Sequence, residues 1–178
     1  AGAEWYGPES QKSPYPDDPV FQEKYAKFIE AFAKKFDNPD EVDFIDGYGL
    51  GKWGESHTMV YKNDVNKKAV FEWATDLYAR CFKKVPLVVN YHRLIGNSGE
   101  PWGPVAPDTE ELLNSAIRKG YILRHDAFGM TDYYQGWEKQ FVANWNYKLP
   151  VLMEGGWITG GGIHRPWIDS SGKYRQGH

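Results

Sequence analysis

The sequence predicts an α/β fold in which parallel strands are joined by helices. Runs with helical periodicity alternate with short, continuous apolar runs, and this alternation calls for right-handed helical crossovers between parallel strands. Polar residues follow every apolar run, as at the C-terminal face of a (β/α)8 barrel, where loops build the active site. We therefore expect a TIM-type barrel. An open doubly wound sheet is the alternative, although the sequence lacks a glycine-rich phosphate loop.

Only about half of a barrel is visible. The strand-like runs are centred near residues 44, 88, 123 and 152, whereas a complete barrel takes about 200 residues or more. Both ends of the sequence are irregular, so we interpret residues 1–178 as a single partial barrel domain. Another chain, or a second copy, would complete it, because an unclosed parallel sheet exposes apolar edges.

The first predicted helix begins near Asp18, which with the following proline makes an N-cap and first-turn pair, and it ends at the turn 37–39. The proline-rich segment before Asp18 is predicted to be a loop. After the helix, residues 42–45 form a short buried strand that leads into a glycine-rich loop carrying Glu55. The apolar residues of the helix recur at steps of three and four: Phe21, Tyr25, Phe28, Ile29, Phe32 and Phe36.

The rest of the chain continues the alternation. Helices are predicted where apolar residues recur on one face, and strands where apolar residues run together. The single cysteine, Cys81, lies on the apolar face of a predicted helix, which favours core packing over catalysis. The further predicted helices span residues 64–82, 108–119 and 134–147. The further predicted strands span residues 86–90, 121–124 and 150–153.

Composition excludes several classes of function. A net charge of −3 and a pI near 6.0, without a basic run, give no electrostatic footprint for nucleic acid or an acidic membrane surface. No apolar stretch approaches the roughly 20 residues that span a bilayer. Aromatic residues make up 16% of the chain, and several of the eight tryptophans lie beside glycine in polar segments. Flat aromatic faces with a polar edge suit sugar rings, so the composition favours a carbohydrate ligand.

Two glutamates carry the strongest functional signal. Glu55 and Glu154 each follow a short apolar run and lie beside glycine and tryptophan, in the segments FIDGYGLGKWGES and PVLMEGGW. Because both follow predicted parallel strands, we expect their carboxylates to meet at one pocket. Such a pair is the minimum equipment for cleaving a glycosidic bond.

The residues around these glutamates resemble clan A glycoside hydrolases, in particular the bacterial beta-galactosidase-like and agarase-like families. The stretch 16–58 is similar to the region around the fourth barrel strand, while LRHDAFG and PVLMEGGW are similar to the ends of strands six and seven. The resemblance implies that the visible strands are four to seven. It also implies that Glu55 is the acid/base and Glu154 the nucleophile of a retaining glycosidase acting on an oligo- or polysaccharide, without metal or cofactor. Such enzymes generally act outside the cytoplasm, so a secreted or periplasmic protein is expected.

One position departs from this family. Clan A enzymes usually carry asparagine immediately before the acid/base, where its amide contacts the sugar 2-hydroxyl, but Gly54 stands there. Another side chain would have to supply that contact, with Asn90, His92 and His57 as candidates. The expected substrate-binding residues lie at the ends of predicted strands or in the loops that follow them: Tyr48, Trp53, His57, Asn90, His92, Arg93, Trp102, Asp126 and Trp157.

Two other functions remain open from the sequence. Gly54 favours a carbohydrate-binding barrel that has lost catalysis. A metal-dependent hydrolase would gather a divalent ion at the same barrel mouth, because imidazole and carboxylate are suitable ligands. The spacing of these residues lacks the regularity of HxH or HExxH sites. The ligands in that case would be Glu55, His57, His125 and Asp126.

Overall fold

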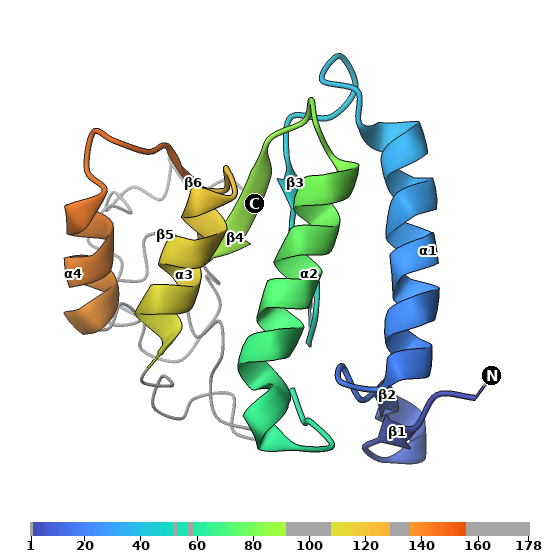
Figure 1. The fold of residues 1–178 in the computed structure, drawn as a ribbon. Helices are drawn as coiled ribbons and strands as arrows, with labels where there is room; N and C mark the ends of the chain where they lie inside the picture. The colour runs from blue at the N-terminus through green and yellow to red at the C-terminus, as the bar shows by residue number, and fades with distance from the viewer. Residues whose placement is uncertain (1, 52, 57–58, 92–107, 129–135, 156–178) are drawn as a thin grey trace, which may run out of the picture.

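The computed structural model describes residues 2–51, 53–56, 59–91, 108–128 and 136–155. Helices form a layer over one face of a four-stranded parallel sheet, and a small two-stranded sheet lies near the N-terminus (Figure 1). The larger sheet contains β3 (Ile45–Asp46), β4 (Leu87–Asn90), β5 (Ile122–Phe128) and β6 (Val151–Gly155). The helices are α1 (Pro19–Phe36), α2 (Lys67–Cys81), α3 (Thr109–Arg118) and α4 (Gly136–Asn144). The 3-10 turns are η1 (Glu9–Gln11) and η2 (Asp64–Asn66).

The strands of the larger sheet lie in the order in which they occur in the chain. β3 pairs with β4, β4 with β5 and β5 with β6, always parallel. This order places β3 and β6 at the edges of the described sheet. A doubly wound sheet would instead reverse its strand order at a switch point. The predicted α/β fold with a parallel sheet is therefore confirmed, and the described strands follow a singly wound order.

Helix α1 forms where the sequence predicted it. The Asp18 carboxylate accepts hydrogen bonds from the backbone N–H groups of Val20 at 2.9 Å and Phe21 at 3.0 Å, as an N-cap does. At the other end, the Asp37 carboxylate accepts backbone N–H bonds from residues 83–85. The end of α1 is thereby joined to the turn that leads into β4.

The N-terminal segment and several strands differ from the prediction. The segment before Asp18 is not simply a loop, because β1 (Trp5–Tyr6) pairs antiparallel with β2 (Ser13–Pro14). Strands of two residues are too short to show a period in sequence. β3 is shorter than the predicted strand 42–45 and begins later, since it contains only Ile45 and Asp46. β5 continues to Phe128, beyond its predicted end, because its last residues pair with β6 across a register shift.

Alternate residues of each strand face opposite sides of the sheet. The side beneath the helices is apolar and joins the core of the protein. The other side, called the inner face here, carries polar and charged residues that the register places in rows. The helix side presents Ile45, Leu87, Val89, Leu123 and Val151. The inner face presents Asp46, Val88, Asn90, Ile122, Arg124, Leu152 and Glu154.

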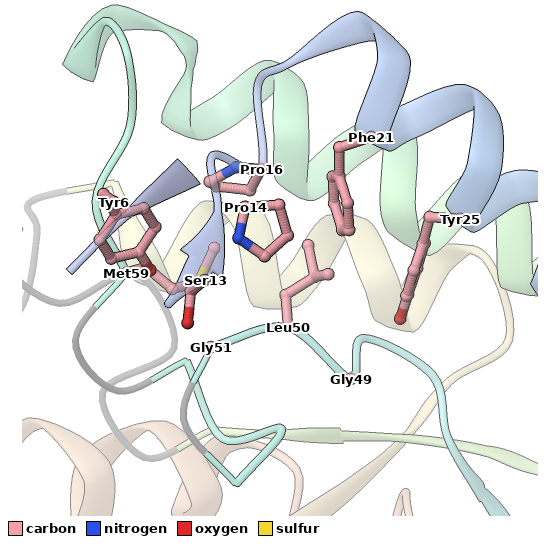
Figure 2. A pocket seen from close by; sticks show the side chains of 10 residues that line it. All are labelled: Tyr6, Ser13, Pro14, Pro16, Phe21, Tyr25, Gly49, Leu50, Gly51 and Met59. Carbon is pink, nitrogen blue, oxygen red and sulfur yellow. The ribbon is translucent and has the colours of Figure 1, made fainter. Parts of the chain in front are cut away.

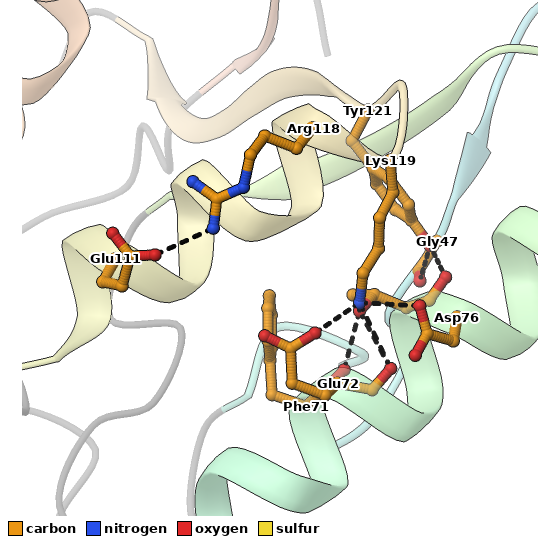
Figure 3. Close-up of polar contacts among 9 residues, drawn as sticks. Gly47, Phe71, Glu72, Asp76, Glu111, Arg118, Lys119 and Tyr121 are labelled. Carbon is orange, nitrogen blue, oxygen red and sulfur yellow. Dashed lines mark hydrogen bonds and ion pairs between the residues drawn. The ribbon is translucent and has the colours of Figure 1, made fainter.

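Polar contacts link the helix layer to the start of the glycine-rich loop (Figure 3). The Tyr121 hydroxyl lies 2.8 Å from the carbonyl oxygen of Gly47 and 3.0 Å from that of Thr75, so it can donate to either. Lys119 contacts Glu72 at 2.5 Å on α2. A Cβ atom at Gly47 would lie 2.4 Å from the Tyr121 ring. Only glycine lets the ring approach the chain here, so the loop begins from a fixed point.

Candidate functional site

Glu55 lies in a loop with an unusual backbone. Trp53 has φ of 60° and Ser56 has φ of 65°, so two non-glycine residues adopt the left-handed region on either side of Glu55. This region is sterically unfavourable for residues with a Cβ, and such outliers cluster at functional sites. Gly54, between them, has φ of 74°. The backbone thus holds Glu55 in a specific, strained turn.

Close contacts across the loop maintain this turn. The Ser56 N–H donates to the Leu50 carbonyl at 2.9 Å, and the Gly54 N–H donates to the Gly51 carbonyl at 3.1 Å. A Cβ atom at Gly51 would lie 2.7 Å from the Cα of Ser56. The glycines of the segment 47–54 therefore let the chain fold back on itself. That fold directs Glu55 over the inner face.

Three carboxylates surround Arg124. We call these four side chains the charge cluster: Asp46, Glu55, Arg124 and Glu154. One guanidinium nitrogen lies 3.2 Å from the Asp46 carboxylate. The other terminal nitrogen lies 3.2 Å from the Glu55 carboxylate and also contacts that of Glu154. The carboxylates thus come from β3, the following loop and β6, while the cation comes from β5.

The two glutamates singled out by the sequence are therefore close together. Their oxygens contact the same nitrogen of Arg124. Two oxygens in this position are at most about 6.5 Å apart, twice the usual upper limit of an N–H···O contact. Glu55 is 14% exposed and Glu154 is 54% exposed. The more buried carboxylate lies in the loop, and the more accessible one lies on the edge strand.

The charges of the cluster influence one another. Burial, together with the negative charges of Glu55 and Glu154, raises the pKa of Asp46 to about 6, against the opposing attraction of Arg124. Burial alone would lower the pKa of Arg124, but Asp46 and Glu154 raise it, so the guanidinium stays charged. Three carboxylates around one cation leave a surplus of negative charge. Asp46 can consequently hold a proton in mildly acidic solution.

A cavity of about 500 Å³ adjoins the cluster. This volume lies within the range of small-molecule sites, about 300–1,000 Å³. Its wall combines an apolar strip with three members of the charge cluster, so it offers both stacking surface and polar contacts. The residues that line it are Phe44, Asp46, Arg124, Leu152, Met153 and Glu154.

A second cavity, of about 210 Å³, adjoins the glycine-rich loop. Figure 2 shows the rings of Tyr6, Phe21 and Tyr25 around it, with the backbone of Gly49 and Gly51 along one wall. The Tyr25 hydroxyl is bonded to that of Tyr78 at 2.9 Å. The same hydroxyl lies 3.5 Å from the Tyr48 carbonyl oxygen, so α1 contacts the loop that carries Glu55.

The structure places the predicted substrate-binding residues unevenly. Tyr48 is buried: its hydroxyl donates to the Met59 sulfur at 3.7 Å, and its ring lies 5.2 Å from that of Phe71. It belongs to the buried core, and this placement does not favour sugar binding. Trp53 is 69% exposed. Asn90 is buried on the inner face, paired in register with Arg124.

Other predicted residues cannot be placed. Asp126 belongs to β5, but its side chain lies outside the described part of the structure. The remaining candidates also lie outside the described residues: His57, His92, Arg93, Trp102 and Trp157.

His125 does not join a metal site with Glu55. Its side chain is fully buried, 3.8 Å from the Glu138 carboxylate of α4, and its ring lies 4.7 Å from that of Tyr91. It therefore faces the helix layer, whereas Glu55 lies over the inner face. Among the described residues, no group of three or more histidine, cysteine, aspartate or glutamate side chains is arranged to hold a metal ion.

Arg124 and Asp46 are the members of the cluster that the sequence interpretation did not emphasise. Arg124 only ends the predicted strand 121–124, and the position of Asp46 at the end of the preceding apolar run indicates that it could orient a ligand or close a hydrogen bond in the loop. A signal was present, since Ile122 and Arg124 alternate with Leu123 and must share one face of the strand.

Comparison of the chain with protein-family models, curated proteins and solved structures gave no match. In the part of the chain that the structure describes, every helix is too short or too polar to cross a membrane.

Proposed function

We propose that this chain is the catalytic part of a glycoside hydrolase that cleaves an oligo- or polysaccharide with retention of configuration. One observation carries the proposal: Glu55 and Glu154, distant in sequence, contact the same guanidinium nitrogen beside a cavity of about 500 Å³. Retaining glycosidases place their carboxyl groups about 5–5.5 Å apart, and inverting ones about 6.5–9.5 Å apart. A shared nitrogen supports the shorter spacing.

The proposed chemistry assigns each glutamate one role. Glu154 attacks the anomeric carbon, forming a glycosyl ester, while Glu55 gives its proton to the oxygen of the departing sugar. Glu55 then takes a proton from water, which attacks the anomeric carbon and releases Glu154. Arg124 holds the Glu154 carboxylate beside the cavity, where the proposal places the anomeric carbon. In the proposed acid step, Glu55 carries its proton on the carboxyl oxygen that does not contact Arg124.

The proposed fold is a (β/α)8 barrel in which β3 to β6 correspond to strands four to seven. Two features support it. First, the strands are parallel and sequential, and helices cover one face of the sheet. Second, a large apolar side chain is exposed at each edge of the described sheet. Phe44, beside the edge strand β3, is 42% exposed. Met153, on the opposite edge strand β6, is 41% exposed. Further strands from another chain or a second copy would cover these edges. A secreted or periplasmic location belongs to the same proposal.

Substitution of the two glutamates tests the function. Parent protein is assayed on a panel of aryl glycosides and neutral oligosaccharides beside Glu55→Gln, Glu154→Gln and the control Glu111→Gln, an exposed glutamate paired with Arg118 on α3. Loss of a general acid costs about 10²–10⁴-fold in rate, and loss of the nucleophile should cost at least as much. Glu111→Gln should match the parent. Equal activity in all four proteins would reject the proposal.

Azide distinguishes the two roles. With Glu154→Ala, azide should attack the anomeric carbon directly and give a glycosyl azide of inverted configuration. With Glu55→Ala and an activated substrate, azide should intercept the glycosyl-enzyme and give the retained product. The reverse assignment of products would exchange the proposed roles.

A sugar-binding barrel without catalysis is the second candidate. The engagement of all three carboxylates by Arg124 favours it, because such a cluster can hold sugar hydroxyls without reacting. Calorimetric sugar binding by a parent protein that hydrolyses none of the panel would establish this function instead.

A further inference from the structure

We propose that Arg124 is the positioning residue of the glutamate pair and that Asp46 anchors it. The inference rests on the proposed hydrolase function but concerns residues to which that function gives no role. Arg124 contacts both glutamates through one nitrogen and Asp46 through the other, so a single rigid group sets the relative position of three carboxylates.

The origin of Arg124 makes it suited to this task. It extends from β5, which is paired on both sides with neighbouring strands, and only 12% of its side chain is exposed. Glu55 lies instead in a loop, and Glu154 lies on an edge strand of the described sheet. The better-held residue therefore supports the two that are less restrained. Reacting groups misplaced by about 1 Å can lose about 10²-fold in rate, so such support matters.

Only a guanidinium can make these contacts together. Its planar fork directs donors from two terminal nitrogens at fixed angles, whereas a lysine ammonium is a single charge on a flexible stem. Lysine could neutralise one carboxylate but could not hold Asp46 and both glutamates in a fixed arrangement. Charge alone is thus insufficient, and the Arg124→Lys variant separates charge from geometry.

Asp46 completes the arrangement from the opposite side. Its carboxylate is bonded to the nitrogen of Arg124 that does not contact the glutamates. Asp46 precedes Gly47, whose carbonyl is bonded to Tyr121 in the core. The guanidinium is therefore tied to the packed part of the protein at one end, and its other end is directed to the reacting pair.

Kinetics test the proposal on the parent enzyme's best substrate. Arg124→Lys and Arg124→Met should lower kcat about 10²-fold with a much smaller change in KM, and Asp46→Asn should lower kcat less. Arg118→Lys and Arg118→Met are matched controls, because Arg118 also pairs with a glutamate but is exposed on α3 (Figure 3). These controls should match the parent. A loss confined to KM would overturn the proposal, since it would make Arg124 a substrate-binding residue.

Chemical rescue separates positioning from folding. Free guanidinium, added at millimolar concentration, should restore part of the kcat of Arg124→Ala and leave Arg118→Ala unchanged. Circular dichroism of the same samples shows whether the variant is folded. A folded Arg124→Ala enzyme that guanidinium does not rescue would contradict the proposal.

A double-mutant cycle tests the contacts without any substrate. Urea unfolding of Arg124→Met, Glu55→Gln, Glu154→Gln and the two double variants should show non-additive losses of stability for both pairs. Additive losses would overturn the positioning role even in an active enzyme. Coupling in a protein without glycosidase activity would instead reject the proposed function and leave the contacts standing.

Discussion

The two faces of the main sheet use neighbouring residues of the same strands for different purposes. On β5, Leu123 is fully buried beneath the helices, and the next residue, Arg124, holds three carboxylates on the inner face. On β3, Ile45 packs against the core while Asp46 joins the charge cluster. The strand period of two therefore separates stability from chemistry. Substitutions of neighbouring residues should therefore affect different properties: stability on the helix side, and the charge cluster on the inner face.

The largest effect is expected on the helix side. Leu123→Ala removes a fully buried side chain and leaves a cavity, so the free energy of unfolding should fall by about 2–5 kcal/mol. Leu152→Ala, on the partly exposed inner face, should cost about 1 kcal/mol or less. Urea unfolding followed by circular dichroism measures both. Equal losses would show that the two faces do not differ as described.

Gly47→Ala should be next in size. Its new Cβ would lie 2.4 Å from the Tyr121 ring, which must move and strain its hydroxyl contacts, at a cost of about 1–3 kcal/mol. Gly136→Ala is the matched control, because no atom lies within 4 Å of the added methyl group. The melting temperatures of the two variants give the comparison. A destabilised Gly136→Ala alone would refute the crowding explanation.

On the inner face, the stability contributed by Asp46 should depend on pH. The pKa of Asp46 in the folded protein, about 6, is above its ordinary value of 3.8, so between these values the folded state binds more protons than the unfolded one. Stability from this group is then present at pH 4 and is lost as the pH rises through 6. Relative to Asp46→Asn, the parent should lose on the order of 1 to 2 kcal/mol between pH 4 and 7, allowing for solvent screening.

Unfolding of both proteins in urea across this pH range provides the measurement. A stability difference between parent and Asp46→Asn that stays constant, or that moves in the parent's favour with rising pH, would contradict the raised pKa of Asp46.

The smallest effect is expected in the loop above the inner face. Gly54 has φ of 74°, and its added Cβ would meet only ordinary contacts, the nearest at 3.6 Å. Asparagine tolerates this conformation, so Gly54→Asn should cost less than about 1 kcal/mol, whereas Gly54→Val should cost about 1–2 kcal/mol. Thermal unfolding distinguishes them. Similar losses for both would point to crowding and not to backbone strain.

Most of the fold could be predicted from sequence because its elements have clear periods. The residues of α1 recur at helical steps after a capping Asp18, and β4 is a continuous apolar run. The extension of β5 could not be predicted, because residues 125–128 favour a strand only when β6 lies beside them. The hairpin of β1 and β2 was missed since it depends on two short pairings.

The candidate site was predictable only in part. That Glu55 and Glu154 approach each other follows from parallel strands, whose C-terminal ends lie at one edge of the sheet. The placement of Tyr48 was not predictable, because a tyrosine in a glycine-rich loop can point to the core or to solvent. The role of Arg124 was not predicted, because a charged residue at the end of an apolar run resembles a strand boundary.

The charge cluster also has a consequence for how the protein folds. In the described sheet, each strand pairs with the strands that precede and follow it in the sequence, so the sheet can grow outward from β4 and β5 one crossover at a time. The cluster, however, needs β3 and β6 docked at the same time, since Asp46 and Glu154 come from opposite edges of the described sheet. It should therefore be the last part to assemble and the first to disappear when either edge frays. Among the four strands of the larger sheet, amide hydrogen exchange should be fastest in β3 and β6.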